Sequence, residues 1–189
     1  MNTLFPIFLK IENLRTLVVG GGYVGLEKVT AILSNGPDAP VTLVAPEIRE
    51  EIKTLADQHP NLQLIYDRYS PGYLANNDLV IVATNDKAVN AQIQADCKSH
   101  RILVNVADTP DLCDFYLSSV VKKGDLKIAI STNGKSPTFA KRFREVLEEI
   151  LPDSLQGTLD NLQTIRNRLK GDFQEKLERL NEITKVMKS

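Results

Sequence analysis

The stretch that decides the fold is residues 17–28, which read LVVGGGYVGLEK. An apolar run enters three successive glycines, and a stretch with helical character follows them. Gly20, Gly22 and Gly25 have the spacing G-x-G-x-x-G, which indicates a dinucleotide-binding turn only between a strand and a helix. There the glycines permit a tight turn, close approach of a pyrophosphate and close packing of the helix. The sequence therefore predicts a dinucleotide site, with a glycine-rich βα corner as the alternative interpretation.

A second strand is predicted at residues 41–45, about 20 residues after the glycines, as the fingerprint expects. Ala45 then stands where an acid would bond the ribose 2′-hydroxyl, and Glu47 follows two residues later. Arg49 is able to meet a 2′-phosphate, so these residues alone leave NAD and NADP open. The predicted cofactor contacts are Gly20, Gly22, Tyr23, Val24, Gly25, Ala45, Pro46, Glu47, Thr84 and Asn105.

Apolar runs alternate with helical patterns up to about residue 112, which is typical of an α/β domain. The run at residues 78–83 is the most continuously apolar, as expected for a parallel strand covered on both faces. We expect a Rossmann-like, doubly wound parallel sheet with an edge strand or lead-in at 4–9. Its strands are predicted at 17–19, 41–45, 62–66, 78–83 and 102–104. Its helices are predicted at 23–33, at 47–56 with Pro46 at the start, and at 86–98 with Asp86 as the cap.

The pattern changes after residue 112. Residues 115–121 and 126–131 are predicted to form a β-hairpin around a short loop that contains Gly124. Ser136 and Pro137 suit the N-cap and first position of a helix that ends near Leu151. The remainder is predicted to be helical, with an apolar stripe that packs on the body or on a partner. The predicted domains are 1–112, 113–149 and 150–189.

Composition excludes several function classes. The 189 residues carry a formal net charge of −1, which gives no case for a nucleic-acid or membrane partner. We expect no signal peptide and no membrane span, because no apolar stretch is long enough. Cys97 and Cys113 are isolated from each other and neither has a histidine beside it, which argues against zinc or a disulfide framework and suits the cytoplasm. No metal ligands are predicted.

Asp108 is the candidate catalytic residue. It lies in a short loop after an apolar strand, at the sheet edge where a nicotinamide ring would project. A carboxylate there can accept a proton as the neighbouring carbon loses hydride. The alternative is that Asp108 only caps the turn that follows.

A basic segment follows the predicted hairpin. Lys135, Lys141, Arg142 and Arg144 lie in a span, residues 135–144, that has no acidic residue. The preceding turn offers the hydroxyls of Ser131, Thr132 and Ser136 near a helix N-terminus. A solvated helix face is one interpretation, and a site for a polyanionic ligand is the other.

Four motifs, in order, resemble the siroheme synthase family. Residues 20–28 and 44–47 are similar to its glycine loop and the turn after its second strand. Residues 105–108 look like its catalytic loop, and residues 124–137 resemble its long signature. The chain lacks the methyltransferase domain of the fused members, so it resembles the stand-alone precorrin-2 dehydrogenase type. Gly25 departs from the alanine common in the family, and Leu117-Ser118 departs from its usual apolar-proline pair.

The resemblance implies NAD-dependent oxidation of precorrin-2 to sirohydrochlorin, towards siroheme or cobalamin, with Asp108 as the base. It implies a homodimer and a carboxylate-rich tetrapyrrole substrate, whose contacts would be Ser131, Thr132, Lys135, Ser136, Lys141 and Arg142. It leaves metal insertion into sirohydrochlorin open. Two other functions stay as alternatives, an NAD-sensing regulatory module without catalysis and a tetrapyrrole carrier.

Overall fold

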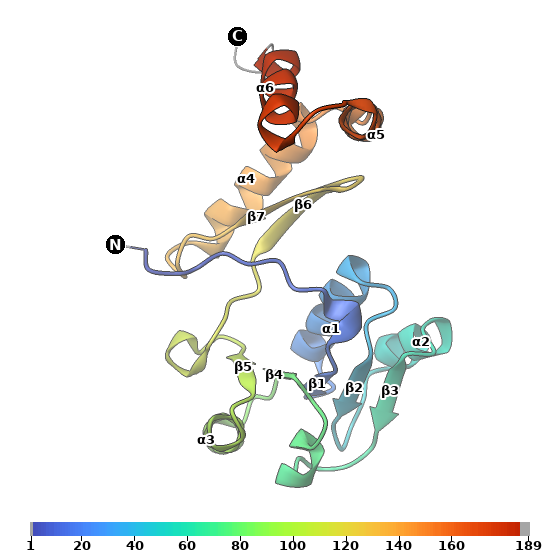
Figure 1. Cartoon of the computed structure of the whole chain (residues 1–189). Coiled ribbons are helices and arrows are strands. Elements are labelled where there is room, and N and C mark those ends of the chain that lie inside the picture. The colour runs from blue at the N-terminus through green and yellow to red at the C-terminus, as the bar shows by residue number, and fades with distance from the viewer. Residues whose placement is uncertain (1, 186–189) are drawn as a thin grey trace. The chain divides into compact units, whose positions relative to one another are not determined.

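A computed structural model describes residues 2–185 of the chain (Figure 1). The chain divides into two compact units, residues 1–117 and residues 118–189.

The first unit is built on a sheet of five parallel strands in the order β3-β2-β1-β4-β5. The strands are β1 (Thr16–Val19), β2 (Val41–Val44), β3 (Leu62–Ile65), β4 (Leu79–Val82) and β5 (Leu103–Val106). The helices are α1 (Tyr23–Asn35), α2 (Glu50–Gln58) and α3 (Lys87–His100), with short 3₁₀ turns η1 (Ile11–Asn13), η2 (Pro71–Leu74) and η3 (Pro110–Leu112). The Rossmann-like, doubly wound fold predicted from the sequence is confirmed.

The sheet separates two hydrophobic cores, because successive side chains of a strand point to opposite faces. Val18 and Ile81 lie in one core with side chains of α1 and α2, among them Val29 and Ile52. The neighbours of Val18 on β1, Leu17 and Val19, lie in the other core with Ile93 and Cys97 of α3. Both faces of the sheet are therefore covered, which explains the continuous apolar runs in its strands.

The second unit combines a hairpin with three helices. Strands β6 (Ser119–Lys123) and β7 (Leu126–Ile130) pair antiparallel, and β6 contacts helix α4 (Pro137–Ile150). Helices α5 (Leu155–Arg168) and α6 (Phe173–Thr184) contact each other. Gln156 of α5 accepts a hydrogen bond from the Asp125 amide (2.7 Å), and Lys123 forms a 2.6 Å ion pair with Asp153, so the hairpin tip is fixed to the start of α5.

Several predicted boundaries are wrong, for local reasons. Pro46 and Glu47 do not open a helix, because residues 47–49 lie against Gly21 and α2 starts at Glu50. The strand predicted at 102–104 ends two residues later, at Val106. Residues 4–9 form no strand, and residues 115–118 precede the hairpin because pairing starts at Ser119.

Among the described residues, none of the helices has the length and apolar character that crossing a bilayer requires.

Candidate functional site

The glycine turn between β1 and α1 is packed backbone against backbone. Gly20 has φ +119°, and a Cβ there would collide with the carbonyl oxygen of Ala83 after β4. A Cβ at Gly25 would collide with the carbonyl oxygen of Gly20, and one at Gly21 with that of Glu47. At these three positions the backbone leaves no room for a Cβ, so a side chain there would require the turn to shift.

Gly22 differs from its neighbours, because a Cβ there would meet no protein atom within 4 Å. It is the N-cap of α1 and satisfies none of the first-turn amides with a side chain, and that turn contains no acidic residue. Unsatisfied amides at a helix N-terminus favour an anion such as a phosphate. The space over Gly22 and the adjacent amides thus fit the pyrophosphate of a dinucleotide.

This turn opens into a cavity of about 860 Å³ at the carboxyl ends of β1, β2 and β4. In an open α/β sheet, ligands bind at this edge where the strand order reverses, here between β1 and β4. Eight predicted cofactor residues line the cavity: Gly20, Gly22, Tyr23, Val24, Ala45, Pro46, Glu47 and Thr84. The predicted contacts Gly25 and Asn105 are not among its lining residues.

The loop after β4 forms a rigid wall of the cavity. Thr84 donates a 2.5 Å hydrogen bond to the side-chain oxygen of buried Asn90, whose amide donates back to the Thr84 carbonyl (3.1 Å). Asp86 caps α3 by accepting bonds from the amides of Ala88 and Val89. Both ends of the loop are therefore held before any ligand binds.

The cavity also includes Arg68, Tyr69, Val89 and Gln92, which sequence reasoning missed. The Tyr69 hydroxyl donates to Asp96 at 3.0 Å, and burial, reinforced by that bond, raises the pKa of Tyr69 above its ordinary value. Arg68 and Tyr69 follow β3 at the same edge of the sheet as the glycine turn. Their position directly after a predicted strand was the sequence signal that could have found them. Val89 and Gln92 carry no such signal, because they reach the cavity only through the packing of α3.

Asp108 lies two residues beyond Val106, the last residue of β5. Val106 pairs with Val82 of β4, and the residue after Val82, Ala83, lines the cavity. It has φ +57°, a left-handed conformation that aspartate tolerates better than most residues. Its side chain is exposed, and no side-chain partner for it is found within residues 2–185. Held at a sparsely populated backbone angle on the ligand-binding edge, Asp108 has features common to active-site residues.

The Asp108 loop is fixed by the segment that covers the outer edge of β5. The Cys113 thiol accepts from the Val106 amide and donates to the Val106 carbonyl, each at 3.2 Å. Burial raises the pKa of Cys113, so the thiol stays protonated and able to donate. Asp114 accepts from the Val104 amide (3.0 Å), and Asn105 donates to the Phe115 carbonyl (2.8 Å). These contacts make Asn105 a residue that positions the loop, and its contact with a cofactor stays a prediction.

In the second unit, the predicted substrate turn is closed by its own hydroxyls. Ser131 accepts from the Asn133 amide, Thr132 from the Ser136 amide, and Ser136 caps α4 through the Phe139 amide. Each hydroxyl still has a proton to donate. The turn is therefore shaped before a ligand binds, and its contact with a substrate remains a prediction.

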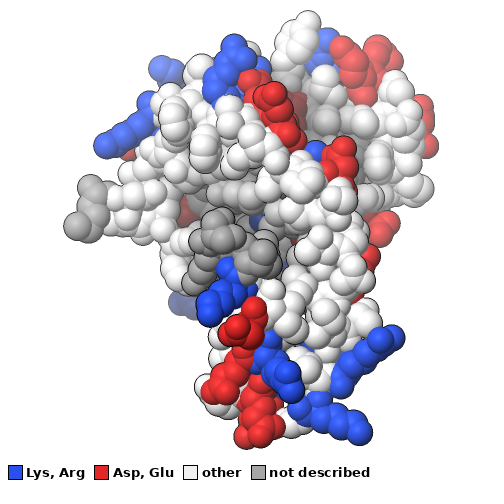
Figure 2. Space-filling view, turned by 90° about the horizontal axis from the view of Figure 1, so that it is seen from above, with Lys and Arg blue, Asp and Glu red and all other residues white. Residues whose placement is uncertain are grey.

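The basic segment is partly neutralised by acids that follow it. Arg142 pairs with Glu145 at 2.9 Å, and Arg144 lies 3.8 Å from Glu148. The Lys141 ammonium also acts on Glu145 and helps to lower the pKa of that carboxyl, whereas Lys135 has no side-chain partner in the described part of the chain. Figure 2 shows that basic and acidic side chains are interspersed on the face in view.

Within residues 2–185, no three histidine, cysteine, aspartate or glutamate side chains lie together as a metal site would require.

Comparison with known families supports the interpretation of the cavity as a dinucleotide site. A family model described as "Putative NAD(P)-binding" matches residues 7–119, and a model for the central part of a sirohaem biosynthesis protein matches residues 123–150. The first model covers the whole parallel sheet and both loops described above.

Individual proteins of similar sequence are siroheme synthases. The chain is 39% identical over 180 residues to siroheme synthase of Psychrobacter arcticus, covering 95% of this chain and 31% of the relative. It is 37% identical to siroheme synthase of Pseudoalteromonas translucida, covering 92% of this chain and 36% of the relative. The chain thus spans about a third of the length of these curated relatives.

A solved structure is similar over nearly the whole chain. SirC, a precorrin-2 dehydrogenase, is 28% identical with a TM-score of 0.76, and the match covers 95% of this chain and 89% of that one. The similarity includes the sheet, the hairpin and the helices that follow it.

Two glycine substitutions should separate folding from ligand binding. Gly25→Ala should lower the free energy of unfolding by about 1–3 kcal/mol, because its methyl group overlaps the Gly20 carbonyl. Gly22→Ala should leave unfolding within about 1 kcal/mol of the wild type. It should nevertheless weaken NAD binding by about tenfold or more, since its methyl group fills the space over the turn. Urea unfolding and calorimetric titration measure the two effects, and equal NAD affinity in Gly22→Ala would contradict the site.

The Cys113 contacts predict a second pair of variants. Cys113→Val keeps a similar volume but leaves the buried Val106 amide without its acceptor, so it should cost about 1–3 kcal/mol. It should also speed hydrogen exchange at that amide. Cys113→Ser retains an acceptor and a donor and should recover much of the protection. Equal exchange rates in the two variants would show that the thiol does not hold the loop.

Proposed function

The chain belongs to the NAD(P)-binding family that its sheet domain matches, and on that premise we propose that it is an NAD-dependent precorrin-2 dehydrogenase. The reaction converts precorrin-2 to sirohydrochlorin, and the product serves siroheme synthesis. The similarity to SirC over nearly the whole chain supports this activity.

The observation that carries the proposal is the open space over Gly22 on a sheet edge that also bears Asp108. The glycine packing fits a dinucleotide because it exposes the α1 amides while Gly20 and Gly25 hold the turn. NAD, when held with its pyrophosphate over Gly22 and the first-turn amides of α1, would supply the hydride acceptor for the dehydrogenation. The chain's own residues must bind and orient the partners and take up the proton that is released.

Asp108 is our candidate for the proton acceptor. Its carboxylate is exposed and has no partner among the described side chains, so it is available as a base. The Cys113 and Asn105 contacts hold its loop without touching the carboxylate itself. General-base assistance of this kind contributes about 10²- to 10⁴-fold in rate.

For the substrate we propose the second unit. Lys135 offers an unpaired ammonium group to the tetrapyrrole carboxylates, and Lys141 and Arg142 are able to exchange Glu145 for a substrate carboxylate. The hydroxyls of Ser131, Thr132 and Ser136 add donors in the same turn. Each exposed ion pair contributes at most about 1 kcal/mol, so several contacts have to act together.

We further propose that the protein is a homodimer. Phe139, Phe143, Val146 and Ile150 share one face of α4 and are 43–65% exposed. The two phenylalanine rings stack with centroids 5.9 Å apart, and the helix packs on β6 through another face that includes Ala140. An exposed apolar stripe on a helix is typical of a surface that a second subunit covers.

A cytoplasmic location is proposed as well. Cys97 and Cys113 are free thiols, and burial raises the pKa of Cys97 to about 12. Unpaired thiols suit a reducing compartment.

Replacement of Asp108 tests the reaction. Asp108→Asn keeps a residue that tolerates φ +57° and removes the base, so the rate of NADH formation from precorrin-2 under anaerobic conditions should fall about 10²- to 10⁴-fold. The dissociation constant for NAD should not change. Asp111→Asn, in the neighbouring turn, is the matched control and should react at the wild-type rate. A normal rate in Asp108→Asn would refute the assignment, and a wild type that binds NAD without turnover would favour a sensing module.

The exposed apolar stripe of α4, formed by Phe139, Phe143, Val146 and Ile150, predicts how a buried charge would affect the dimer. Phe143→Glu would place an unpaired carboxylate in the proposed interface and should weaken the dimer at least about tenfold. Thr138→Glu introduces the same charge at an exposed position outside the stripe and should leave the dimer intact. Sedimentation velocity measures both, and an unchanged mass for Phe143→Glu would exclude this surface.

A further inference from the structure

The loop after β2 places a guanidinium beside the glycine turn. The Arg49 guanidinium carbon lies 3.5 Å from the centroid of the Tyr23 ring, a cation–π contact. The Arg49 amide donates to the Gly21 carbonyl at 3.1 Å, which fixes the residue to the turn. Gly21 and Tyr23 both line the cavity, so Arg49 contacts two of its lining residues.

Arg49 is already engaged by an acid. Its Nη2 atom lies 2.5 Å from Glu51 Oε1, and this hydrogen bond is the largest cause that raises the pKa of Arg49 and lowers that of Glu51. The Arg49 Nε atom is buried without a hydrogen-bond partner. The guanidinium therefore has two partners, the Glu51 carboxylate with which it forms its ion pair and the Tyr23 side chain.

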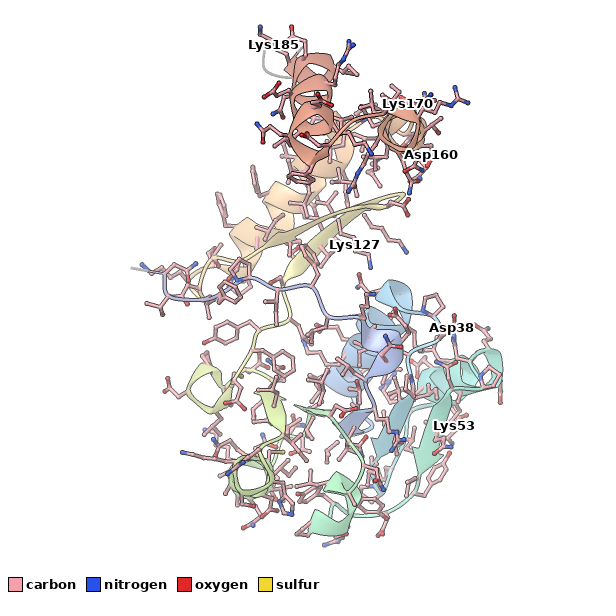
Figure 3. The ribbon with its side chains drawn as sticks, in the orientation of Figure 1. Asp38, Lys53, Lys127, Asp160, Lys170 and Lys185 are labelled. Atoms are coloured by element: carbon pink, nitrogen blue, oxygen red, sulfur yellow. The ribbon has the colours of Figure 1, made fainter. Side chains whose placement is uncertain are left out.

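The other charged groups nearby have different roles. Glu50 pairs with Lys53 at 2.7 Å on the exposed side of α2, where Figure 3 labels Lys53. Glu47 and Arg68 line the cavity. Glu51 is thus the acid that holds Arg49, while its neighbour Glu50 makes an equivalent pair with another cation.

This position matters because the end of the second strand is where a dinucleotide fold distinguishes its cofactors. An acid there accepts from the ribose 2′-hydroxyl of NAD, whereas an arginine nearby accommodates the 2′-phosphate of NADP. Here an arginine stands in the loop, but its charge is compensated by Glu51.

We propose that Glu51 is a specificity-determining residue, which holds the Arg49 guanidinium away from a 2′-phosphate and so gives the site its preference for NAD. The inference rests on the proposed function, in that the cavity takes a dinucleotide. For NADP to bind, Arg49 must exchange the Glu51 carboxylate for the phosphate, and the carboxylate left behind repels that phosphate. Stacking on Tyr23 keeps a released guanidinium at the edge of the cavity, so removal of Glu51 supplies a cation in place.

The test compares dissociation constants of NAD and NADP for the wild type and for Glu51→Gln, measured by calorimetry. AMP and adenosine 2′,5′-bisphosphate are titrated as well, because they differ at the 2′ position and contain no nicotinamide. Glu51→Gln should improve affinity for the two 2′-phosphorylated ligands by about twofold to fivefold, the range set by loss of one partly exposed ion pair. Affinity for NAD and AMP should change less than about twofold.

Two further variants isolate the mechanism. Glu50→Gln removes the same charge one residue away, without touching Arg49, and should give no comparable gain. Adding Arg49→Gln to Glu51→Gln should abolish the gain, since the double mutant lacks the released guanidinium.

Each outcome decides the inference. A gain that is specific to Glu51→Gln and lost without Arg49 supports it. An unchanged ratio of NAD to NADP affinity, or an equal gain in Glu50→Gln, overturns it while leaving the proposed function intact. If the wild type binds neither dinucleotide, the proposed function and this inference both fail.

Discussion

The structure depends on one close backbone contact, in which the Gly20 carbonyl lies where a side chain at residue 25 would be. Because no side chain separates them, the first turn of α1 packs directly on the end of β1. The same turn meets Ala83 after β4, so the two strands at which the order reverses are joined through main-chain atoms. This contact sets the position and the direction of the α1 N-terminus, and it thereby sets the position of the cavity that the turn lines.

A second constraint is the open edge of the sheet at β5. An edge strand presents unpaired amides and carbonyls, which a protein has to satisfy or cover. Here Cys113 and Asp114 supply thiol and carboxylate partners in place of a sixth strand. The loop between β5 and this covering segment carries Asp108, so the bonds that close the sheet also restrict the candidate base. Stability at the edge and geometry at the site thus have a common origin.

Features encoded by local chemistry were predictable from the sequence. The glycine turn, the Asp86 and Ser136 caps and the alternation of strands with helices all depend on residues within a few positions of one another. Asp86 and Ser136 do accept the expected backbone bonds. The fold class followed because each of these signals favoured the same arrangement.

What the sequence did not reveal depends on contacts formed only in the folded chain. The start of α2 moved to Glu50 because the preceding loop packs on Gly21, a residue far back in the sequence. Arg68 reaches the cavity from the segment after β3, and Gln92 reaches it from α3. The charge of Arg142 is compensated by Glu145, just beyond the span whose composition suggested a basic site.

The division of the interior by the sheet has a consequence for how such a chain can diverge. Val18 contacts one population of side chains, and Leu17 and Val19 contact another, with the main chain of β1 between them. A change of volume beside α3 is therefore accommodated by neighbours on that side, and the layer under α1 and α2 does not need to adjust. Compensating substitutions among relatives should therefore occur within one core. The core beneath α1 and α2 and the core beneath α3 can accumulate substitutions independently of each other.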